Sequence, residues 1–381
     1  MKKLLALSLA VLMILAMAIP AAAGSAFDKE TFRVTDKKTI MWDNSAYNGG
    51  GASGNPFCYA GNYGTGRNSY GDVAGYQAVD FGANGASKVT VNFGYHKQDP
   101  AVDIPTTFAI YVDNIFGKPI ANFSVAAGTT KGSEIVNHKE FTADVAVPGG
   151  THNVYFIATN DKSGSFDWIQ FTESDKKITK MTYAKDEMQY EAGVSGFNAF
   201  KDMTINNKGF ILDNIWSDGT DAKWVDKHGI GYSNQGDMVV YPNVDFGKKG
   251  AKSFTINFAN GDAAKNCPLE LYIDDPLGEP AAKFEAKPSG GWTVDKAAPV
   301  TVDCKVPNGV HTVIVKFATN QSGSFTTVKF AEADSVIYTA EQLAEQEAAK
   351  QAAQTGDSTV ALVALAAASL VGIAVVSKKR A

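Results

Sequence analysis

One sequence pattern occurs twice in this chain of 381 residues. Residues 71–82 are GDVAGYQAVDFG and residues 236–247 are GDMVVYPNVDFG, so the same Gly-Asp pair, Tyr and Val-Asp-Phe-Gly run recur 165 positions later. Three more pairs of segments repeat in the same order: VTVNF at 89–93 and FTINF at 254–258, IYVDN at 110–114 and LYIDD at 271–275, and HNVYFIATNDKSGSF at 152–166 and HTVIVKFATNQSGSF at 311–325. A repeat of this length is a whole domain rather than a solenoid unit. The chain therefore contains two copies of one fold.

Each copy carries the pattern of antiparallel β-strands. Apolar and polar residues alternate over 89–93 and again over 254–258, which places one face of a strand on a core and the other in solvent. Turn-forming clusters separate such runs, for example GANG at 82–85 and PNG at 307–309. No amphipathic helix of ordinary length is predicted between residues 28 and 335. Many short strands with regular turns indicate an all-β chain of two tandem β-sandwiches.

We predict that the sandwiches occupy residues 28–175 and 176–335. A segment rich in Ala, Glu and Gln follows, and its composition predicts a helical stalk over residues 336–356. Its apolar residues are mostly Ala, so the stalk has little surface to bury.

The N-terminus indicates export. Lys2 and Lys3 precede a mostly apolar run that ends at Ile19, and a small-residue cleavage pattern follows up to Ala23. These are the parts of a secretory signal peptide over residues 1–23. The apolar run is short for a bilayer-spanning helix.

The C-terminal segment, residues 357–381, resembles a membrane anchor. Residues 359–376 carry no charge, and a Lys-Lys-Arg cluster follows them. The layout is similar to the cell-wall sorting signal of Gram-positive bacteria, which a sortase cuts between Thr and Gly, here Thr355 and Gly356. That signal has Leu-Pro or Asn-Pro where this chain has Ala352 and Ala353, so either sortase attachment or simple membrane anchoring stays open. Both place the protein at the cell surface, attached to the bacterial membrane or wall.

The net charge argues against nucleic acid as a partner, and the cysteine content argues against a fold held by disulfides. The net charge is −5 and no basic, aromatic cluster marks the sandwiches, so nucleic acid is not expected as a partner. Three cysteines are too few for a disulfide framework in an exported chain of this length. Cys267 and Cys304 of the second copy either pair or are small buried residues, and Cys58 is left over.

No constellation of catalytic residues is recognisable, so we expect no enzyme activity. The five histidines lack metal-ligand spacing, and His152 and His311 are equivalent strand residues of the two copies. Nucleophile elbows and phosphate-binding loops are absent from the sequence. No acidic pair is singled out by its spacing as an acid–base couple.

The repeated segments resemble the family 6 carbohydrate-binding module, a galactose-binding-like jelly-roll β-sandwich. The family's markers are Gly-Tyr, Gly-Asp-Trp, Tyr, Val-Asp-Phe-Gly, Gly-Gly-Trp, Gly-x-His-x-Val and Asp-Trp-Phe-x-Phe. The second copy carries Gly231-Tyr232, Gly236-Asp237, Tyr241, Val244–Gly247, Gly290–Trp292 and Gly309–Val313. The first copy keeps Gly71-Asp72, Tyr76, Val79–Gly82, Val154 and Asp167-Trp168. The resemblance covers most of both copies.

The resemblance also implies a sugar-binding site at the loop end of the second sandwich. In the family this site uses the Tyr of Gly-Tyr, the Trp after Gly-Gly and an Asn before the final strand motif. These positions are Tyr232, Trp292 and Ser324 here, so the third has a shorter side chain than the family's Asn. Flat aromatic rings stack on the apolar faces of sugars, and polar neighbours fix the hydroxyl groups. The alternative for Tyr232 and Trp292 is ordinary packing.

The first copy departs from the family at these positions. Arg67, Ser133 and Ser165 stand there, so the aromatic pair is lost. Other aromatic residues of the preceding Gly-rich stretch offer a substitute pair, and the alternative is a domain that binds no sugar: these residues are Tyr59, Tyr63 and Tyr70. Trp168 has a strand position and is expected in the core.

An extra loop in the second copy contains Trp216 and Trp224, and we expect Trp224 to wall one side of the sugar site. Its acidic residues Asp218, Asp221 and Asp226 are a second possibility, as oxygen ligands of calcium. The family also binds a structural calcium through an N-terminal Glu-Ala-Glu, which neither copy shows cleanly. Calcium is therefore the one cofactor that the sequence leaves open.

The leading hypothesis is a non-catalytic, surface-displayed protein that binds polysaccharide or oligosaccharide. The alternative is an adhesion or cell-envelope protein that uses the sandwiches for protein contacts. The identity of the glycan is not encoded in these motifs, because linkage specificity depends on loop shape.

Overall fold

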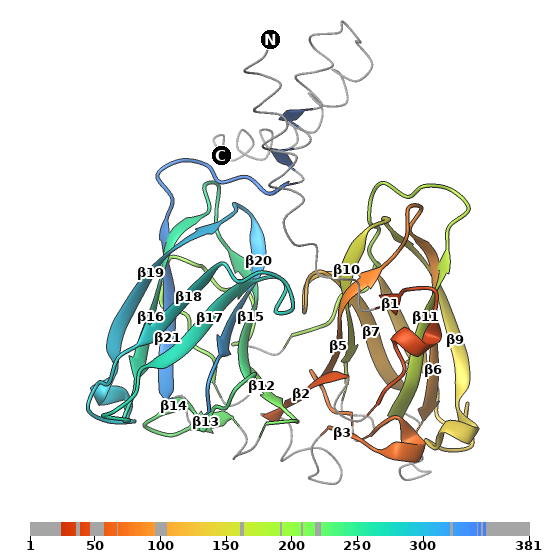
Figure 1. Cartoon of the computed structure of the whole chain (residues 1–381), viewed down its shortest axis with the longest axis horizontal. Helices are drawn as coiled ribbons and strands as arrows, with labels where there is room; N and C mark the ends of the chain where they lie inside the picture. Colours follow the sequence, from red (N-terminus) through yellow and green to blue (C-terminus); the bar gives the residue numbers. More distant parts are fainter. Residues whose placement is uncertain are drawn as a thin grey trace, which may run out of the picture.

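A computed structural model describes residues 24–35, 39–45, 57–66, 68–95, 105–160, 164–190, 193–206, 209–217, 222–320, 323–340, 342–343 and 346–347. Through residue 335 this part consists of β-strands with four short 3-10 helices, arranged as two β-sandwiches side by side (Figure 1). The predicted all-β tandem is thus confirmed. The candidate leader and anchor lie outside the described residues, among which no helix is long and apolar enough to span a membrane.

The first sandwich, module 1, has a larger and a smaller antiparallel sheet. The larger contains β2 (Ile40–Asn44), β5 (Val73–Asp80), β10 (Thr151–Ala158), β7 (Thr106–Val112) and β8 (Ala121–Val125), with β1 (Gly24–Ser25) parallel to β5. The smaller contains β11 (Gly164–Glu173), β6 (Ala86–Tyr95) and β9 (Lys139–Val147), beside a short hairpin of β3 (Cys58–Tyr59) and β4 (Thr65–Gly66). The alternating strand residues, such as Val89, Val91 and Phe93, point between the sheets into one apolar core.

The second sandwich, module 2, repeats this plan. Its larger sheet contains β12 (Phe210–Asn214), β15 (Met238–Asp245), β20 (Val310–Phe317), β17 (Cys267–Ile273) and β18 (Ala282–Ala286). Its smaller sheet contains β13 (Lys223–Val225), β14 (Gly229–Gly231), β21 (Ser324–Glu332), β16 (Ala251–Ala259) and β19 (Ala298–Val306). Cys267 and Cys304 lie in the core of this module as buried thiols, which decides between the two alternatives for this pair.

The repeated Gly-Asp pair is a buried turn in both modules. The carboxylate of Asp72 accepts hydrogen bonds from the backbone amides of Asn44 (2.8 Å) and Ser69 (2.5 Å). Asp237 does the same for Asn214 (2.8 Å) and Asn234 (2.6 Å). Each Asp therefore ties the end of β2 or β12 to the turn that contains the motif. The motif thus belongs to the shared scaffold.

The two modules are joined into one continuous sheet. Strands β2 and β12 pair antiparallel, with Asp43 opposite Asp213, so the two larger sheets form an 11-stranded sheet within the described residues. The outer faces of these sheets pack against each other in a third apolar cluster. Its members include Trp42, Tyr111, Tyr155, Phe210, Leu212, Met238, Val240 and Ile314. Burial of so much apolar surface couples the modules rigidly.

Repeated residues also form a polar clasp between the modules. Asn114 of module 1 donates from Nδ2 to Asp274 Oδ1 (3.0 Å), and its Oδ1 accepts from Thr312 Oγ1 (3.1 Å). Asp275 is the module 2 counterpart of Asn114 and reaches the opposite way, accepting from Asn153 Nδ2 (2.8 Å) and from the Tyr155 hydroxyl. Burial raises the pKa of Asp275, against the lowering effect of these hydrogen bonds. The Asp-Asn and Asp-Asp of the repeat therefore hold the copies together.

Candidate functional site at the loop end of module 2

Tyr232 is an exposed aromatic residue on a fixed backbone. It follows β14 with a φ of 61°, a left-handed conformation that is uncommon for a bulky residue, and its side chain is 56% exposed. The next two residues, Ser233 and Asn234, are buried, and Ser233 Oγ donates to Gly323 O (3.3 Å). The strained backbone is thus held by its surroundings while the ring faces solvent, an arrangement that clusters at functional sites.

Trp292 is the only exposed one of the five tryptophans, all of which lie in the described residues. Its indole lies against Gly261, where a Cβ atom would come within 2.3 Å of the indole Cε2. Asn260 anchors this loop, because its Nδ2 donates to Lys265 O (2.8 Å) and its backbone bonds to Ser289. The missing side chain at Gly261 therefore lets the indole lie on the backbone with 39% of it exposed.

Ser324 lies between the backbone anchors of these two rings. It pairs across the sheet with Ala259, two residues before Gly261, and its Oγ would be 3.2 Å from a Cβ at Gly231. A hydrogen bond from Val294 N to Lys227 O (2.9 Å) ties the Trp292 loop to the β13–β14 hairpin. We call Tyr232, Trp292, Ser324 and Lys223 the loop-end site. Ser324 is buried, with only 3% of its surface exposed.

Two neighbouring residues of the β13–β14 hairpin point to opposite sides: Lys223 toward the Tyr232 ring and Trp224 toward the module core. Lys223 Nζ lies 5.1 Å from the centroid of the Tyr232 ring, which is within cation–π range. Trp224, the next residue, sits opposite Ile230 and packs against the module core, so it is partly buried. Trp224 thus anchors the hairpin to the core. Its expected role as a wall of the sugar site stays a prediction.

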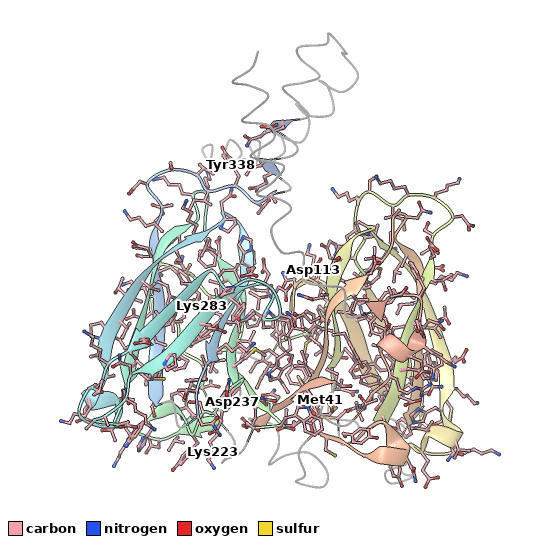
Figure 2. The ribbon with its side chains drawn as sticks, in the orientation of Figure 1. Met41, Asp113, Lys223, Asp237, Lys283 and Tyr338 are labelled. Carbon is pink, nitrogen blue, oxygen red and sulfur yellow. The ribbon has the colours of Figure 1, made fainter. Side chains whose placement is uncertain are left out.

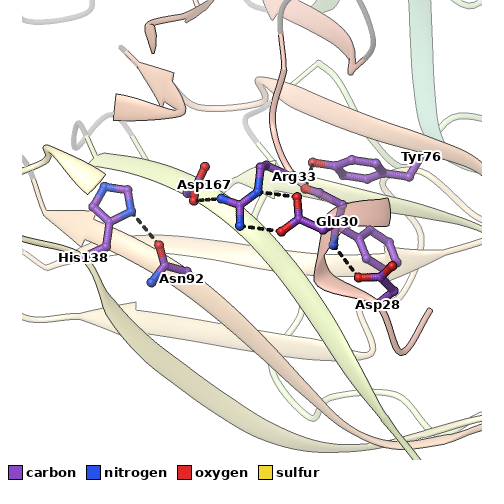
Figure 3. A network of polar contacts seen from close by, with 8 residues as sticks. Asp28, Glu30, Arg33, Tyr76, Asn92, His138 and Asp167 are labelled. Carbon is purple, nitrogen blue, oxygen red and sulfur yellow. Dashed lines mark hydrogen bonds and ion pairs between the residues drawn. The ribbon is translucent and has the colours of Figure 1, made fainter. Parts of the chain in front are cut away.

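At its own loop end, module 1 has a histidine, His138, where module 2 has Ala297. His138 follows the 3-10 helix Ile135–Asn137 as Ala297 follows Val294–Lys296 in module 2. Its Nε2 lies 2.8 Å from Ser133 O and 3.0 Å from Ser165 Oγ, and its Nδ1 lies 3.0 Å from Asn92 Oδ1 (Figure 3). Gly94 makes room for the ring, since a Cβ there would be 2.3 Å from His138 Cδ2, and burial lowers the pKa of His138.

The other aromatic residues of module 1 do not rebuild the aromatic pair. Tyr70 is buried, stacks on Phe210 at the inter-module interface and donates to Gln189 O (2.8 Å), so the expectation that it substitutes at a sugar site is wrong. Tyr59 packs against the module 1 core, and Tyr63 remains exposed. Arg67 lies outside the described residues. Trp168 is buried, as expected from its strand position, and Lys29 Nζ lies 5.5 Å from the centroid of its ring.

A cation site is not assembled by the described residues, among which no three His, Cys, Asp or Glu side chains come together. Asp218 and Asp221 lie outside this part of the chain. In module 1 the N-terminal segment does bring Glu30 near the buried Asp167, but Arg33 bonds to both (Figure 3). A guanidinium therefore supplies the positive charge at this place.

The sequence alone missed three residues that shape the loop ends: Lys223, Gly261 and His138. Gly261 and His138 have no local motif, because their importance lies in what packs on them from another loop. Lys223 precedes Trp224 in an insertion with no counterpart motif in module 1. When the two copies are aligned by strand register, Ala259 aligns with Gly94 and Ala297 aligns with His138. This alignment is the signal that would have found His138.

Comparison with known proteins identifies one family. The model of the family described as carbohydrate binding module (family 6) matches residues 46–173 and 215–332. Similar solved structures include a family 6 module from Clostridium stercorarium in complex with cellobiose, at 19% identity and a TM-score of 0.28, covering 36% of this chain and 97% of that one. Another is a β-1,3-glucan-binding module from Bacillus halodurans, at 22% identity and 0.29, covering 36% and 98%. No curated protein matches the chain.

Proposed function

Because the chain belongs to family 6 of the carbohydrate-binding modules, which bind carbohydrate without catalysis, we propose that it binds glycan at the loop-end site of module 2. Tyr232 and Trp292 stack on sugar rings, and Lys223 and Ser324 contact hydroxyl groups. The observation that carries this proposal is the pair of aromatic rings held exposed on fixed backbone, one by Ser233 and Asn234, the other by Gly261. Exposed apolar surface rimmed by polar residues marks interaction sites, and a flat aromatic ring offers an apolar face for stacking.

We propose further that module 1 does not bind glycan at its loop end. The His138 imidazole occupies the space beside Ser165, the counterpart of Ser324, and the position of Trp292 is Ser133. Module 1 then acts as a rigid partner that covers the apolar outer face of module 2.

The orientation of module 2 supports display at a cell surface. Lys223 at the loop end and Tyr338, where the chain leaves the module, lie at opposite ends (Figure 2). The predicted leader and anchor would export the protein and hold it at its C-terminus, in the membrane or the wall. The loop-end site would then point away from that surface.

Affinity electrophoresis of the two-module body, residues 24–343, tests the glycan proposal. We expect gels that contain xylan or a β-glucan to retard it, and Trp292→Ala to abolish the retardation. Tyr63→Ala is the matched control, since this tyrosine is exposed to a similar extent and lies on module 1. Retardation that persists in Trp292→Ala would remove the site. An array that is blank across plant, algal and bacterial wall glycans would favour the protein-contact alternative.

A further inference from the structure

A groove lies at the junction of the two modules, away from the loop-end site. Two adjoining hollows form it, with volumes of about 260 and 540 Å³. Both are lined by Asn214, Gly236 and Lys316, so the hollows meet at these residues. We call them together the inter-module groove. The larger hollow is within the size range of ligand pockets.

Both modules supply the walls of the smaller hollow. Trp42 and Gln77 come from module 1, and Trp42 Nε1 donates to Gly236 O (2.9 Å) while Gln77 Nε2 donates to Leu277 O (2.7 Å). In the larger hollow, Trp216 of module 2 is held by a bond from its Nε1 to Thr39 O of module 1 (2.9 Å). Residues of both modules therefore line the smaller hollow, whereas residues of module 2 alone line the larger one.

A lysine sits where the two hollows meet. Lys316 Nζ lies 5.2 Å from the centroid of the Tyr272 ring and donates to Pro276 O (3.3 Å), its one hydrogen-bond acceptor among the described residues. Burial lowers the pKa of Lys316, the mark of an ammonium that water only partly reaches. An ammonium has three donors, so two of them are left for a ligand in the groove.

A carboxylate balances this charge. Tyr272 donates its hydroxyl to Glu270 Oε2 (2.7 Å), and Lys283 pairs with Glu270 Oε1 at 3.2 Å. Burial opposes ionisation of Glu270, but these hydrogen bonds outweigh it and hold the pKa of Glu270 below its usual value. A groove with fixed groups of both signs suits a neutral ligand with many hydroxyl groups better than a simple anion.

The outer part of the groove adds amides and an aromatic ring. Asn214 donates to Gln235 O (3.1 Å), and Asn320 accepts from Gln235 N (2.9 Å), so these side chains form a connected polar rim. Trp216 lines the same hollow and is only partly buried. Amides that donate and accept beside an aromatic face match the hydroxyl groups and apolar face of a sugar.

We propose that the inter-module groove is a second carbohydrate-binding site for a short stretch of neutral glycan, with its larger hollow in module 2 and its smaller hollow completed by module 1. Lys316 and Glu270 bind hydroxyl groups at its centre, and Trp216 contacts a sugar face at its outer end. The ligand class rests on the carbohydrate-binding function of the family, but the groove does not depend on the loop-end site.

The five tryptophans make the two sites separable by NMR of the 15N-labelled two-module body, residues 24–343, which holds both cores and their interface. Each indole N–H gives one signal, assigned by Trp→Phe variants. Trp42 and Trp216 report on the groove, Trp292 and Trp224 on the loop-end site, and Trp168 on neither. The probes are xylohexaose, cellohexaose and laminarihexaose, each titrated into the wild type and into Trp292→Ala.

We expect at least one hexasaccharide to shift the Trp216 and Trp42 signals in Trp292→Ala. Lys316→Met should weaken this binding tenfold or more, because it removes the central donors and keeps the length of the side chain. Lys329→Met on the smaller sheet of module 2 is the control and should change nothing.

The outcomes separate this proposal from that of the loop-end site. Shifts confined to Trp292 and Trp224 would overturn the groove and leave the loop-end site standing. Shifts of Trp216 and Trp42 that Lys316→Met leaves unchanged would also overturn the groove. If Trp292→Ala leaves every affinity unchanged while Lys316→Met lowers it, the groove stands and the loop-end proposal falls. No shift with any hexasaccharide overturns both.

Discussion

The loop ends of the two modules share one scaffold and differ in what lies beside an equivalent serine. In module 2 Ala259 pairs with Ser324, and the side chains of Tyr232 and Trp292 are exposed. In module 1 Gly94 replaces Ala259, and the space is taken by His138, which lies within hydrogen-bond distance of Ser165 Oγ (3.0 Å). The imidazole of His138 thus fills the space beside Ser165 that a ligand would need. The duplication therefore kept the fold twice and the exposed aromatic pair once.

The largest expected effect comes from the buried aspartates of the repeated motif. Asp237→Asn places an amide donor against the backbone amides of Asn214 and Asn234, and we expect it to lower the free energy of unfolding by about 2–4 kcal/mol. Because Asn234 follows Tyr232 by two residues, glycan affinity should fall as well. Urea unfolding and titration calorimetry measure the two effects.

Asp72→Asn in module 1 is the matched control for this comparison. Its carboxylate makes the same two contacts, with Asn44 and Ser69, so a similar loss of stability is expected. The affinity of the folded protein for glycan should stay at the wild-type value. An equal loss of affinity in both variants would show that the loop ends do not act separately.

A methyl group added at Gly261 tests whether Trp292 must lie against this glycine, and it leaves the side chains of the loop-end site unchanged. Gly261→Ala puts a Cβ 2.3 Å from the Trp292 indole, so the ring must move. We expect glycan affinity to fall about tenfold, or about 1.4 kcal/mol, with little change in the unfolding midpoint. Calorimetry checks the affinity, and Trp fluorescence checks that the indole environment changed.

The control for this substitution is Gly132→Ala in the β8–β9 loop of module 1, which is the counterpart of the loop that carries Trp292. There the added Cβ has one ordinary contact, with Asn137 Nδ2 at 3.5 Å. Affinity and fluorescence should both be unchanged. If Gly261→Ala binds glycan as well as the wild type, Trp292 does not need its seat on Gly261 to function.

Transplanting the histidine should close the site of module 2. In Ala259→Gly/Ala297→His the imidazole gains the room that Gly94 gives His138, and it can approach Ser324 Oγ and the Trp292 carbonyl. We expect a several-fold loss of affinity, about 1 kcal/mol, because Ser324 becomes tied to the imidazole. The single variant Ala259→Gly isolates the effect of the cavity and should bind nearly as the wild type. Unaltered binding by the double variant would separate ligand binding from the surroundings of Ser324.

The sequence predicted the scaffold because period-two alternation and turn chemistry are local signals. The alternation at 89–93 and 254–258 appears in the structure as predicted. The positions of Tyr232 and Trp292 came from the family resemblance, and the structure shows that both side chains are exposed. Tyr70 shows the limit of this approach, since its burial depends on Phe210 of the other module, 140 positions away.

Contacts between the modules had no signal in either copy taken alone. The apolar outer faces at Tyr111 and Val240 look like ordinary strand residues until the second sandwich is placed against them. The DN and DD ends of the repeated segments at 110–114 and 271–275 were visible as a repeat, but their role in the clasp depends on positive φ values at Asp113 and Asp274. A repeat indicates common structure, and only the packing reveals that it also forms an interface.

The smallest expected effect concerns pH, and it again sets equivalent regions against each other. His152 and His311 lie beside Asp113 and Asp274 of the clasp, and although burial opposes protonation, the hydrogen bonds to these carboxylates raise the pKa of both histidines. Their stabilising contribution is therefore complete below the unfolded-state pKa of about 6.5 and is lost as the pH rises through the folded-state value. His138 behaves oppositely, because burial lowers its pKa, so its contribution is present above about pH 6.5 and is lost as the pH falls.

Urea unfolding of the wild type, His311→Gln and His138→Gln between about pH 5 and about pH 9 checks these signs. The stability difference between wild type and His311→Gln should shrink toward the alkaline end, and that between wild type and His138→Gln toward the acid end. The His311→Gln profile thus reports on the clasp between the modules, and the His138→Gln profile reports on the closed loop end of module 1. Parallel profiles would mean that the imidazoles contribute through packing alone, and the contrast between the clasp and the closed loop end would then lie in shape rather than in charge.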